Sequence, residues 1–87
     1  MIHIITTRGF DKSFKKKDQF IQKKALERIR LFRESPSNIL LNNHPLSGEH
    51  KKERSFNVTG DYRIIFYNVD ENTVCLVDIG THPELYG

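Results

Sequence analysis

The chain has 87 residues, of which 37% are apolar and 29% charged, and its net charge is +3. This composition is typical of a folded globular protein, and the length predicts one small domain over residues 1–87. No apolar stretch approaches the ~20 residues that a membrane helix needs. A single cysteine, Cys75, excludes an internal disulfide. The first residues lack the basic region of a signal peptide, so we expect a cytoplasmic protein without a membrane partner.

The charge is distributed unevenly along the chain. Residues 1–54 hold 13 Lys and Arg against 6 Asp and Glu, a net +7, whereas residues 55–87 hold one Arg against five Asp and Glu, a net −4. A basic half of this kind indicates an anionic partner, either a nucleic acid or an acidic protein. A solvated helical surface would also account for it, and from charge alone both interpretations stay open.

The N-terminal half predicts one strand followed by two helices. β-branched and apolar residues over 2–6 favour a short strand, which Gly9 interrupts. Asp11 is a candidate N-cap for a first helical stretch, and Asp18 begins a longer helix that Pro36 ends. Apolar residues three or four positions apart predict the buried face of that longer helix: Phe20, Ile21, Ala25, Ile29 and Phe32.

A loop is expected over residues 37–52, because Asn, Pro, Gly and charged residues dominate there. Three leucines in this region are candidate anchors to the core: Leu40, Leu41 and Leu46. The loop separates the helical half of the chain from a half with a different periodicity.

The C-terminal half predicts three strands, over residues 54–58, 62–68 and 73–79, because its side chains alternate or form short apolar runs between turn residues. Two short turns between three strands indicate an antiparallel meander. The expected fold class is therefore α+β: an N-terminal strand, two helices and a three-stranded antiparallel meander, with the helices on one face of the sheet.

Two histidines flank the predicted sheet, His44 before it and His82 after it. Histidine titrates near neutrality, so the two side chains could divide the roles of general acid and base. RNA is a substrate that needs this pair, since its own 2′-OH is the nucleophile, and Arg54 and Arg63 could hold the phosphate. No metal-ligand spacing, phosphate-binding loop or nucleophile elbow occurs, so we expect neither a metal nor a cofactor.

Four segments resemble the RelE/ParE toxin superfamily, and most closely its YafQ-like mRNA interferases: HPLSG at 44–48, RSFNV at 54–58, GDYRIIFY at 60–67 and DIGTHPELYG at 78–87. The resemblance runs through the chain in order and length. It implies a RelE-like microbial RNase fold and a toxin of a type II toxin–antitoxin system that cleaves messenger RNA on the ribosome without a metal. The implied partners are the ribosome with its mRNA and an acidic cognate antitoxin, bound in a hetero-oligomer.

The resemblance also implies five catalytic residues. His44 corresponds to a catalytic histidine, the expected base or its helper, and Asp61 to an aspartate that orients or assists it. His82 corresponds to the general acid, and Arg63 to an arginine directed at the phosphate. Tyr86 corresponds to a C-terminal aromatic residue that holds the substrate.

Further contacts with RNA are expected from six basic side chains and from Asn57. The basic residues are Lys15, Lys16, Lys17, Lys51, Lys52 and Arg54. YafQ-like toxins often have a histidine where this chain has Asn57, and an asparagine can hydrogen-bond but cannot carry a proton at neutral pH. An inactive relative that only binds a partner is therefore one alternative. A ParE-like poison of DNA gyrase is another, which the histidine pair disfavours.

Overall fold

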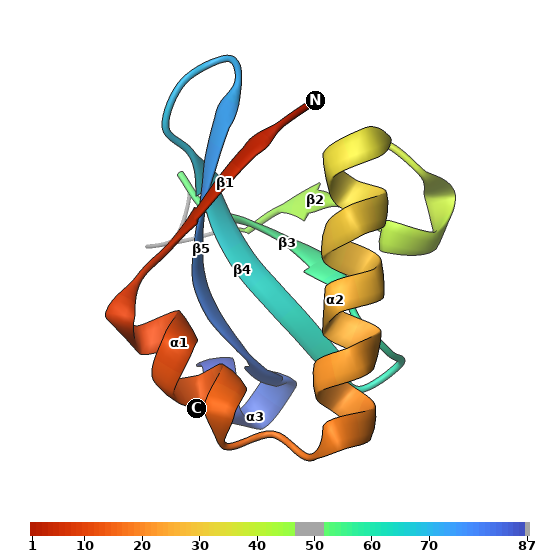
Figure 1. Cartoon of the computed structure of the whole chain (residues 1–87), viewed down its shortest axis with the longest axis vertical. Helices are drawn as coiled ribbons and strands as arrows, with labels where there is room; N and C mark the ends of the chain where they lie inside the picture. The colour runs from red at the N-terminus through yellow and green to blue at the C-terminus, as the bar shows by residue number, and fades with distance from the viewer. Residues whose placement is uncertain (47–51, 87) are drawn as a thin grey trace.

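The computed structural model describes residues 1–46 and 52–86, which form a five-stranded sheet and three α-helices (Figure 1). The strands are β1 (His3–Thr6), β2 (His44–Pro45), β3 (Arg54–Asn57), β4 (Tyr62–Asn68) and β5 (Thr73–Thr81). The helices are α1 (Arg8–Lys15), α2 (Gln19–Glu34) and α3 (His82–Tyr86), with a 3-10 turn, η1, over Ile39–Leu41. The strand order is β1-β5-β4-β3-β2.

The predicted meander is confirmed, since β3, β4 and β5 pair antiparallel in sequence order. The sheet is wider than the meander, because β1 adds to β5 in parallel and β2 adds to β3 antiparallel. The loop expected over residues 37–52 is therefore wrong in part, as η1 and β2 lie within it. A strand of two residues is too short to produce an alternating pattern that sequence analysis could detect.

Helices α1 and α2 cover one face of the sheet, as Figure 1 shows, and the main core lies beneath them. Phe32 of α2 is at its centre: its ring centroid lies 4.7 Å from that of Phe56 and 4.8 Å from that of Phe66. Among the three predicted leucine anchors, Leu41 is buried, Leu46 is half-buried and Leu40 is exposed. Helices α1 and α2 therefore pack against the apolar side of β3, β4 and β5.

The start of α2 is confirmed and the start of α1 is not. The Oδ1 atom of Asp18 accepts a hydrogen bond of 2.9 Å from the Ile21 amide, as an N-cap does. For α1 the N-cap is Thr7 rather than Asp11, so Gly9 lies inside the helix. The Thr7 hydroxyl accepts from an α1 amide and also donates to the Val77 carbonyl oxygen at 2.8 Å. That second, long-range contact favours Thr7 over an aspartate one turn later.

The expected buried face of α2 is correct except at Phe20, which is 67% exposed. Ile21, Ala25 and Phe32 are buried, and Ile29 is half-buried. An α-helix turns by about 100° per residue. Phe20 therefore points about 100° away from its neighbour Ile21, and it lies outside the stripe that contacts the sheet.

Candidate functional site

Two of the predicted catalytic side chains, His44 and Arg63, share the sheet face opposite α1 and α2. Directly paired residues of neighbouring strands project to the same face, as do residues two apart on one strand. His44 pairs with Ser55, Asn57 with Arg63, and Arg63 with Gly80. Phe56, between Ser55 and Asn57 on β3, packs against α2. We call the opposite side of the sheet the site face. The paired residues project from it: His44, Ser55, Asn57, Arg63 and Gly80.

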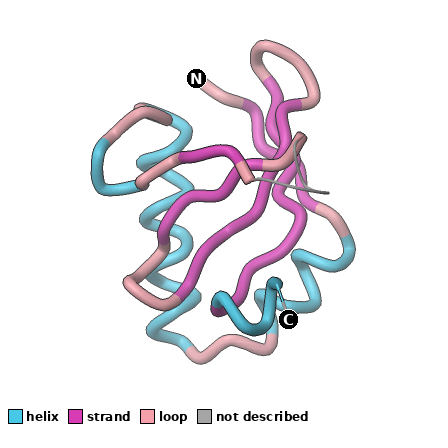
Figure 2. Tube along the Cα trace, turned by 180° about the vertical axis from the view of Figure 1, so that it is seen from behind, coloured by secondary structure: helices cyan, strands magenta, loops and turns pink. Residues whose placement is uncertain are grey.

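Three of the predicted catalytic residues line one open depression. It has a volume of about 560 Å³, and its lining comprises Gly60, Asp61, Tyr62, Arg63, Thr81, His82 and Pro83. Tyr86 adjoins it, because its ring centroid lies 4.7 Å from that of His82 with the planes tilted by 52°. Seen from behind, the last helix before the C-terminus, α3, lies against the end of the sheet (Figure 2). The structure thus brings Asp61, Arg63, His82 and Tyr86 to one place.

His44 lies apart from this depression, on the edge strand β2. Its Nδ1 atom is 2.8 Å from the carbonyl oxygen of Asn42. A carbonyl oxygen can only accept, so Nδ1 carries the proton, and Nε2 of the neutral ring is left as a proton acceptor. The His44 ring is thereby held in the tautomer that a general base needs.

The expected pairing of His44 with Asp61 is not found among the described residues. His44 is paired in the sheet with Ser55, six positions before Asp61, and Asp61 lies beside His82 in the depression. The turn that carries Asp61 joins β3 to β4 at the end far from β2. Asp61 therefore lies near His82 and Arg63 rather than near His44.

Arg54 points away from the site face. It pairs with Phe66, whose ring packs against α2. The Nε atom of Arg54 donates a hydrogen bond of 2.9 Å to Oδ1 of Asn43. The structure therefore separates Arg54 from Asn57 and Arg63, because side chains on one strand alternate between the two faces of the sheet.

The predicted RNA-binding lysines differ in how accessible they are. Lys15, Lys16 and Lys52 are exposed. The side chain of Lys17 is only 11% exposed, and its ammonium lies 3.4 Å from Oε1 of Glu84. Lys51 lies outside the described residues. The charge of Lys17 is therefore used within the protein, whereas the three exposed lysines can meet a partner.

Two side-chain oxygens on the site face are buried without a hydrogen-bond partner in the described part of the chain: Oγ of Ser55 and Oδ1 of Asn57. A buried polar atom without a partner is costly, and such atoms are uncommon in folded proteins. Asn57 lies directly opposite Arg63 on the neighbouring strand. The Asn57 side chain thus adjoins Arg63 on the site face, with its oxygen turned inward.

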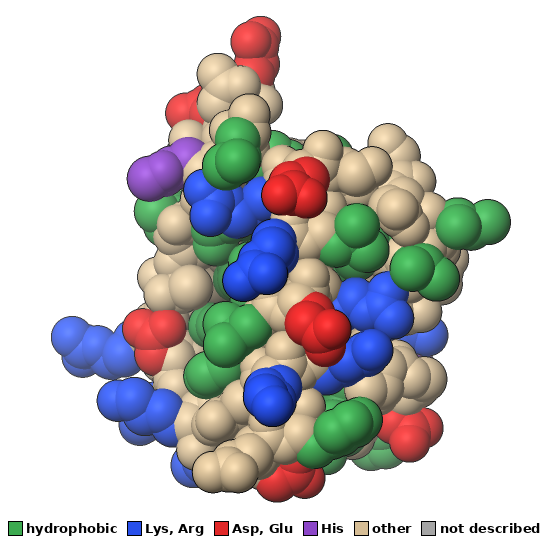
Figure 3. Space-filling model, turned by 45° about the vertical axis from the view of Figure 1, so that its right-hand side comes forward, with side chains coloured by type: hydrophobic (Ala, Val, Ile, Leu, Met, Phe, Trp, Pro, Cys, Tyr) green, Lys and Arg blue, Asp and Glu red, His purple; other side chains and the backbone are tan. Residues whose placement is uncertain are grey.

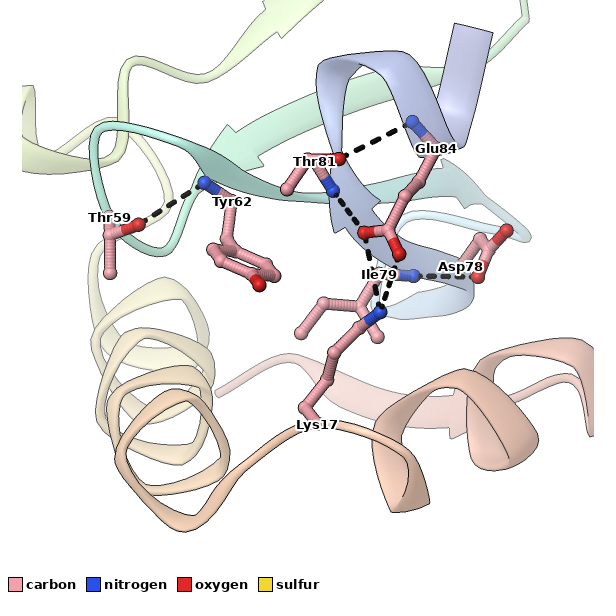
Figure 4. Close-up of polar contacts among 7 residues, drawn as sticks. All are labelled: Lys17, Thr59, Tyr62, Asp78, Ile79, Thr81 and Glu84. Atoms are coloured by element: carbon pink, nitrogen blue, oxygen red, sulfur yellow. Dashed lines mark hydrogen bonds and ion pairs between the residues drawn. The ribbon is translucent and has the colours of Figure 1, made fainter. Parts of the chain in front are cut away.

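The residues that build α3 were not predicted from the sequence. The Thr81 amide donates to Oε1 of Glu84 at 2.8 Å, and the Glu84 amide donates to Oγ1 of Thr81 at 3.3 Å (Figure 4). This reciprocal pair is a capping box, for which Thr-x-x-Glu is the sequence signal. The amide of Thr81 and the ammonium of Lys17 together lower the pKa of Glu84. The pattern was therefore available in the sequence, directly around His82.

In residues 1–46 and 52–86, no group of three or more His, Cys, Asp and Glu side chains could hold a metal ion. The helices of that part of the chain are all too short or too polar to cross a membrane.

Solved structures of several bacterial toxins share this fold. YafQ from E. coli strain BL21(DE3) matches with a TM-score of 0.78 and 22% identity over 100% of both chains. E. coli YafQ in its complex with DinJ matches with a TM-score of 0.72 and 24% identity, also over 100% of both chains. A YoeB/ParE toxin from Agrobacterium tumefaciens matches with a TM-score of 0.77 and 16% identity, over 93% of this chain and 99% of its own. The predicted RelE-like fold is therefore confirmed.

Sequence relationships are more specific than these folds. None of the curated proteins matches the sequence. The family model for YafQ, the bacterial toxin of a type II toxin–antitoxin system, matches residues 2–87. This match spans the whole fold and both histidine-bearing segments, so the chain belongs to the YafQ family of bacterial toxins of type II toxin–antitoxin systems.

Proposed function

We propose that this toxin is an endoribonuclease that cleaves messenger RNA on the ribosome, in the cytoplasm and without a metal or cofactor. The observation that carries the proposal is the depression lined by Asp61, Arg63 and His82. It combines a proton donor, a cation with a forked set of donors and a carboxylate in one open site. Family membership supports a toxin role, and the chemistry of this site supports RNA as the target.

The proposed reaction is an attack by the RNA on its own backbone. His44 takes the proton of the 2′-OH, whose oxygen forms a bond to the adjacent phosphorus. The bond from phosphorus to the 5′-oxygen breaks, and His82 gives its proton to that leaving oxygen. Arg63 stabilises the negative charge on the phosphate during the step. The products are a 2′,3′-cyclic phosphate and a free 5′-hydroxyl.

The sheet indicates how the RNA would lie. His44 and His82 are on β2 and directly after β5, so β3 and β4 separate them. At about 4.8 Å per strand, β2 and β5 are on the order of 14 Å apart. The RNA chain would therefore cross β3 and β4, above Asn57 and Arg63, and the two imidazole rings would reach inward from either side toward one phosphate. Asn57, which lies opposite Arg63, would contact the RNA there, and Tyr86 would hold a base by stacking.

A cleavage assay tests this proposal: the purified toxin should cut mRNA that is bound to ribosomes. His44→Ala and His82→Ala should each reduce the rate on the order of 10²–10⁴-fold, because each removes an acid or a base. His3→Ala is the matched control, since His3 is an exposed histidine on β1, outside the site. An RNA with 2′-deoxyribose at the cut position should bind and remain intact.

Three results would contradict the proposal: cleavage of the deoxy substrate, a 3′-hydroxyl product, or full activity of the His44→Ala/His82→Ala double variant. Absence of cleavage together with inhibition of DNA gyrase would instead assign the toxin to the gyrase-poisoning class. Absence of both activities, with antitoxin binding retained, would indicate an inactive binding module.

We further propose that the partner is an acidic antitoxin that forms a hetero-oligomer with the toxin. The basic N-terminal half supports an acidic partner, and exposed apolar side chains offer anchors beside that charge, among them Phe20 and Ile39. Apolar anchors would provide the affinity, and the charges would mainly set the association rate and the specificity. Co-purification with the product of the neighbouring gene tests this, and failure of that product to bind the toxin would refute it.

A further inference from the structure

The short helix α3 carries His82 and Tyr86 but contributes little to the core. None of residues 82–86, all within the described chain, is buried. A five-residue helix has no intrinsic stability in water. Its position over the sheet must therefore come from specific contacts, and those contacts decide where the His82 imidazole lies.

The first contact is the capping box between Thr81 and Glu84. It satisfies two amides at the start of α3, with bonds of 2.8 and 3.3 Å. Because His82 is the first residue of the helix, it lies between the two members of the box. The direction in which the His82 side chain leaves the backbone is therefore fixed by Glu84.

The second contact is an ion pair that joins α3 to the rest of the molecule. The ammonium of Lys17, in the connection between α1 and α2, lies 3.4 Å from each carboxylate oxygen of Glu84. The same ammonium lies 5.8 Å from the centre of the Tyr62 ring, within range of a cation–π interaction. Figure 4 shows Lys17 below Glu84, with Tyr62 beside it. Tyr62 lies between Asp61 and Arg63 in the chain, so Lys17 connects both parts of the depression.

The third contact is a close approach at Gly80. A Cβ atom at this position would lie 3.0 Å from Oε1 and 3.1 Å from Cβ of Glu84, and 3.5 Å from Cδ2 of Leu85. The glycine therefore lets α3 fold directly onto β5, with the Glu84 carboxylate held between the sheet and Lys17.

We propose that Glu84 and Lys17 are positioning residues for the reaction of this toxin: through the capping box and the ion pair they hold His82 and Tyr86 over the depression. The inference rests on the proposed ribonuclease function. It assigns to Lys17 a role within the site rather than a contact with RNA phosphate. Neither residue touches the reacting atoms, so both act through His82.

A series of variants separates the two contacts. Glu84→Ala removes the cap acceptor and the ion pair, whereas Glu84→Gln keeps an acceptor for the Thr81 amide and loses the charge. Lys17→Gln removes the ion pair, and Lys17→Arg retains it. Glu27→Gln and Lys23→Gln are matched controls, because both residues are exposed on α2.

Two readouts are needed, cleavage on ribosomes and the NMR signals of the His82 ring without RNA. The Tyr86 ring, 4.7 Å away, shifts the His82 proton signals by its ring current. Glu84→Ala should move these signals toward those of a Tyr86→Leu variant and reduce kcat on the order of 10²-fold with little change in KM, as expected when a reacting group is misplaced. Glu84→Gln and Lys17→Gln should show smaller effects, and Lys17→Arg and both controls none.

The outcomes distinguish this inference from the function on which it rests. If Glu84→Ala cleaves as fast as the wild type and its His82 signals are unchanged, the positioning role is wrong and the ribonuclease stands. If the signals shift in Glu84→Ala but even the wild type cleaves no RNA, the positioning of His82 holds and the proposed function fails. If Lys17→Gln loses activity while its His82 signals and those of Glu84→Ala match the wild type, Lys17 binds RNA directly and the inference is overturned.

Discussion

The backbone of Asn42 governs how the His44 ring is presented. Asn42 ends η1 in the left-handed conformation, with φ of 46°, and its carbonyl oxygen accepts the bond from Nδ1 of His44. Asparagine tolerates this conformation better than most residues, whereas a β-branched side chain is strained there. A single backbone angle therefore helps to set the tautomer of the proposed base.

Substitutions at Asn42 should follow from this conformation. Asn42→Gly should leave stability and cleavage close to the wild type, because glycine adopts a positive φ readily. Asn42→Val should cost about 1–2 kcal/mol of unfolding free energy. It should also reduce the cleavage rate, because it displaces the carbonyl oxygen that accepts the hydrogen bond from His44. Urea unfolding and ribosome cleavage measure the two effects. Equal behaviour of the glycine and valine variants would contradict the argument.

The ionisation of Glu84 should make α3 sensitive to acid. Its pKa is lowered from 4.5 by the hydrogen bond from the Thr81 amide and by Lys17. A carboxyl group with a lowered pKa in the folded state stabilises that state above its unfolded pKa. The stabilisation is lost as the pH falls through the folded value. NMR signals of α3 should therefore change below pH 4.5, and Glu84→Gln should remove that step. A transition of unchanged midpoint in Glu84→Gln would assign it to another group.

Helix α2 packs on the centre of the sheet. The ring of its Phe32 contacts Phe56 of β3 and Phe66 of β4. These two strands carry Asn57 and Arg63 on their other face, so the packing of α2 holds those two residues side by side. Packing on one face of the sheet thereby fixes the spacing of the groups on the site face. The loss of this packing should affect stability and function together.

Two phenylalanine variants of α2 form a matched pair. Phe32→Ala should cost about 3–5 kcal/mol, since it leaves a cavity beside the rings of Phe56 and Phe66. For a domain this small, that is a large part of the total stability of about 5–15 kcal/mol. Phe20→Ala should change stability by less than about 0.5 kcal/mol, because Phe20 is 67% exposed. Chemical denaturation of both variants, compared by midpoint, checks the packing. Similar costs at the two positions would contradict it.

The surface of the molecule carries its positive charge in different ways on different sides. On the face seen in Figure 3, Lys and Arg side chains are interspersed with Asp, Glu and exposed apolar side chains. Such a mixed surface suits a protein partner, whose contacts combine apolar and charged groups, better than it suits a nucleic acid backbone. We therefore expect RNA to contact the exposed lysines that lie outside α2, which are Lys15, Lys16 and Lys52.

The salt dependence of RNA binding tests this division. Neutralising Lys15, Lys16 and Lys52 should weaken binding to single-stranded RNA. It should also lower the slope of log K against log salt by about 0.7 per lost contact. A control neutralised at Lys23 and Arg30, which are exposed on α2, should keep the wild-type slope. The assignment fails if the control lowers the slope as much as the lysine variant does.

Local sequence patterns predicted α2, the three strands of the meander and the family of this protein. The alternation over β3 to β5 and the spacing of apolar residues in α2 are properties of consecutive residues, so they could be read without a structure. The cap at Asp18 is likewise local. The motifs around His44 and His82 led to the resemblance that the family model confirms over residues 2–87.

Which side chains meet depends on contacts between segments that are far apart in the chain. Thr7 rather than Asp11 caps α1 because the Thr7 hydroxyl also bonds to β5. Lys17 turns inward because it pairs with Glu84, which lies 67 positions later in the chain. Arg54 leaves the site because its place in the register puts it on the helix side of the sheet. Periodicity and caps depend on neighbours in sequence, whereas the partners of a charge or a hydroxyl depend on strand register and on contacts between distant segments.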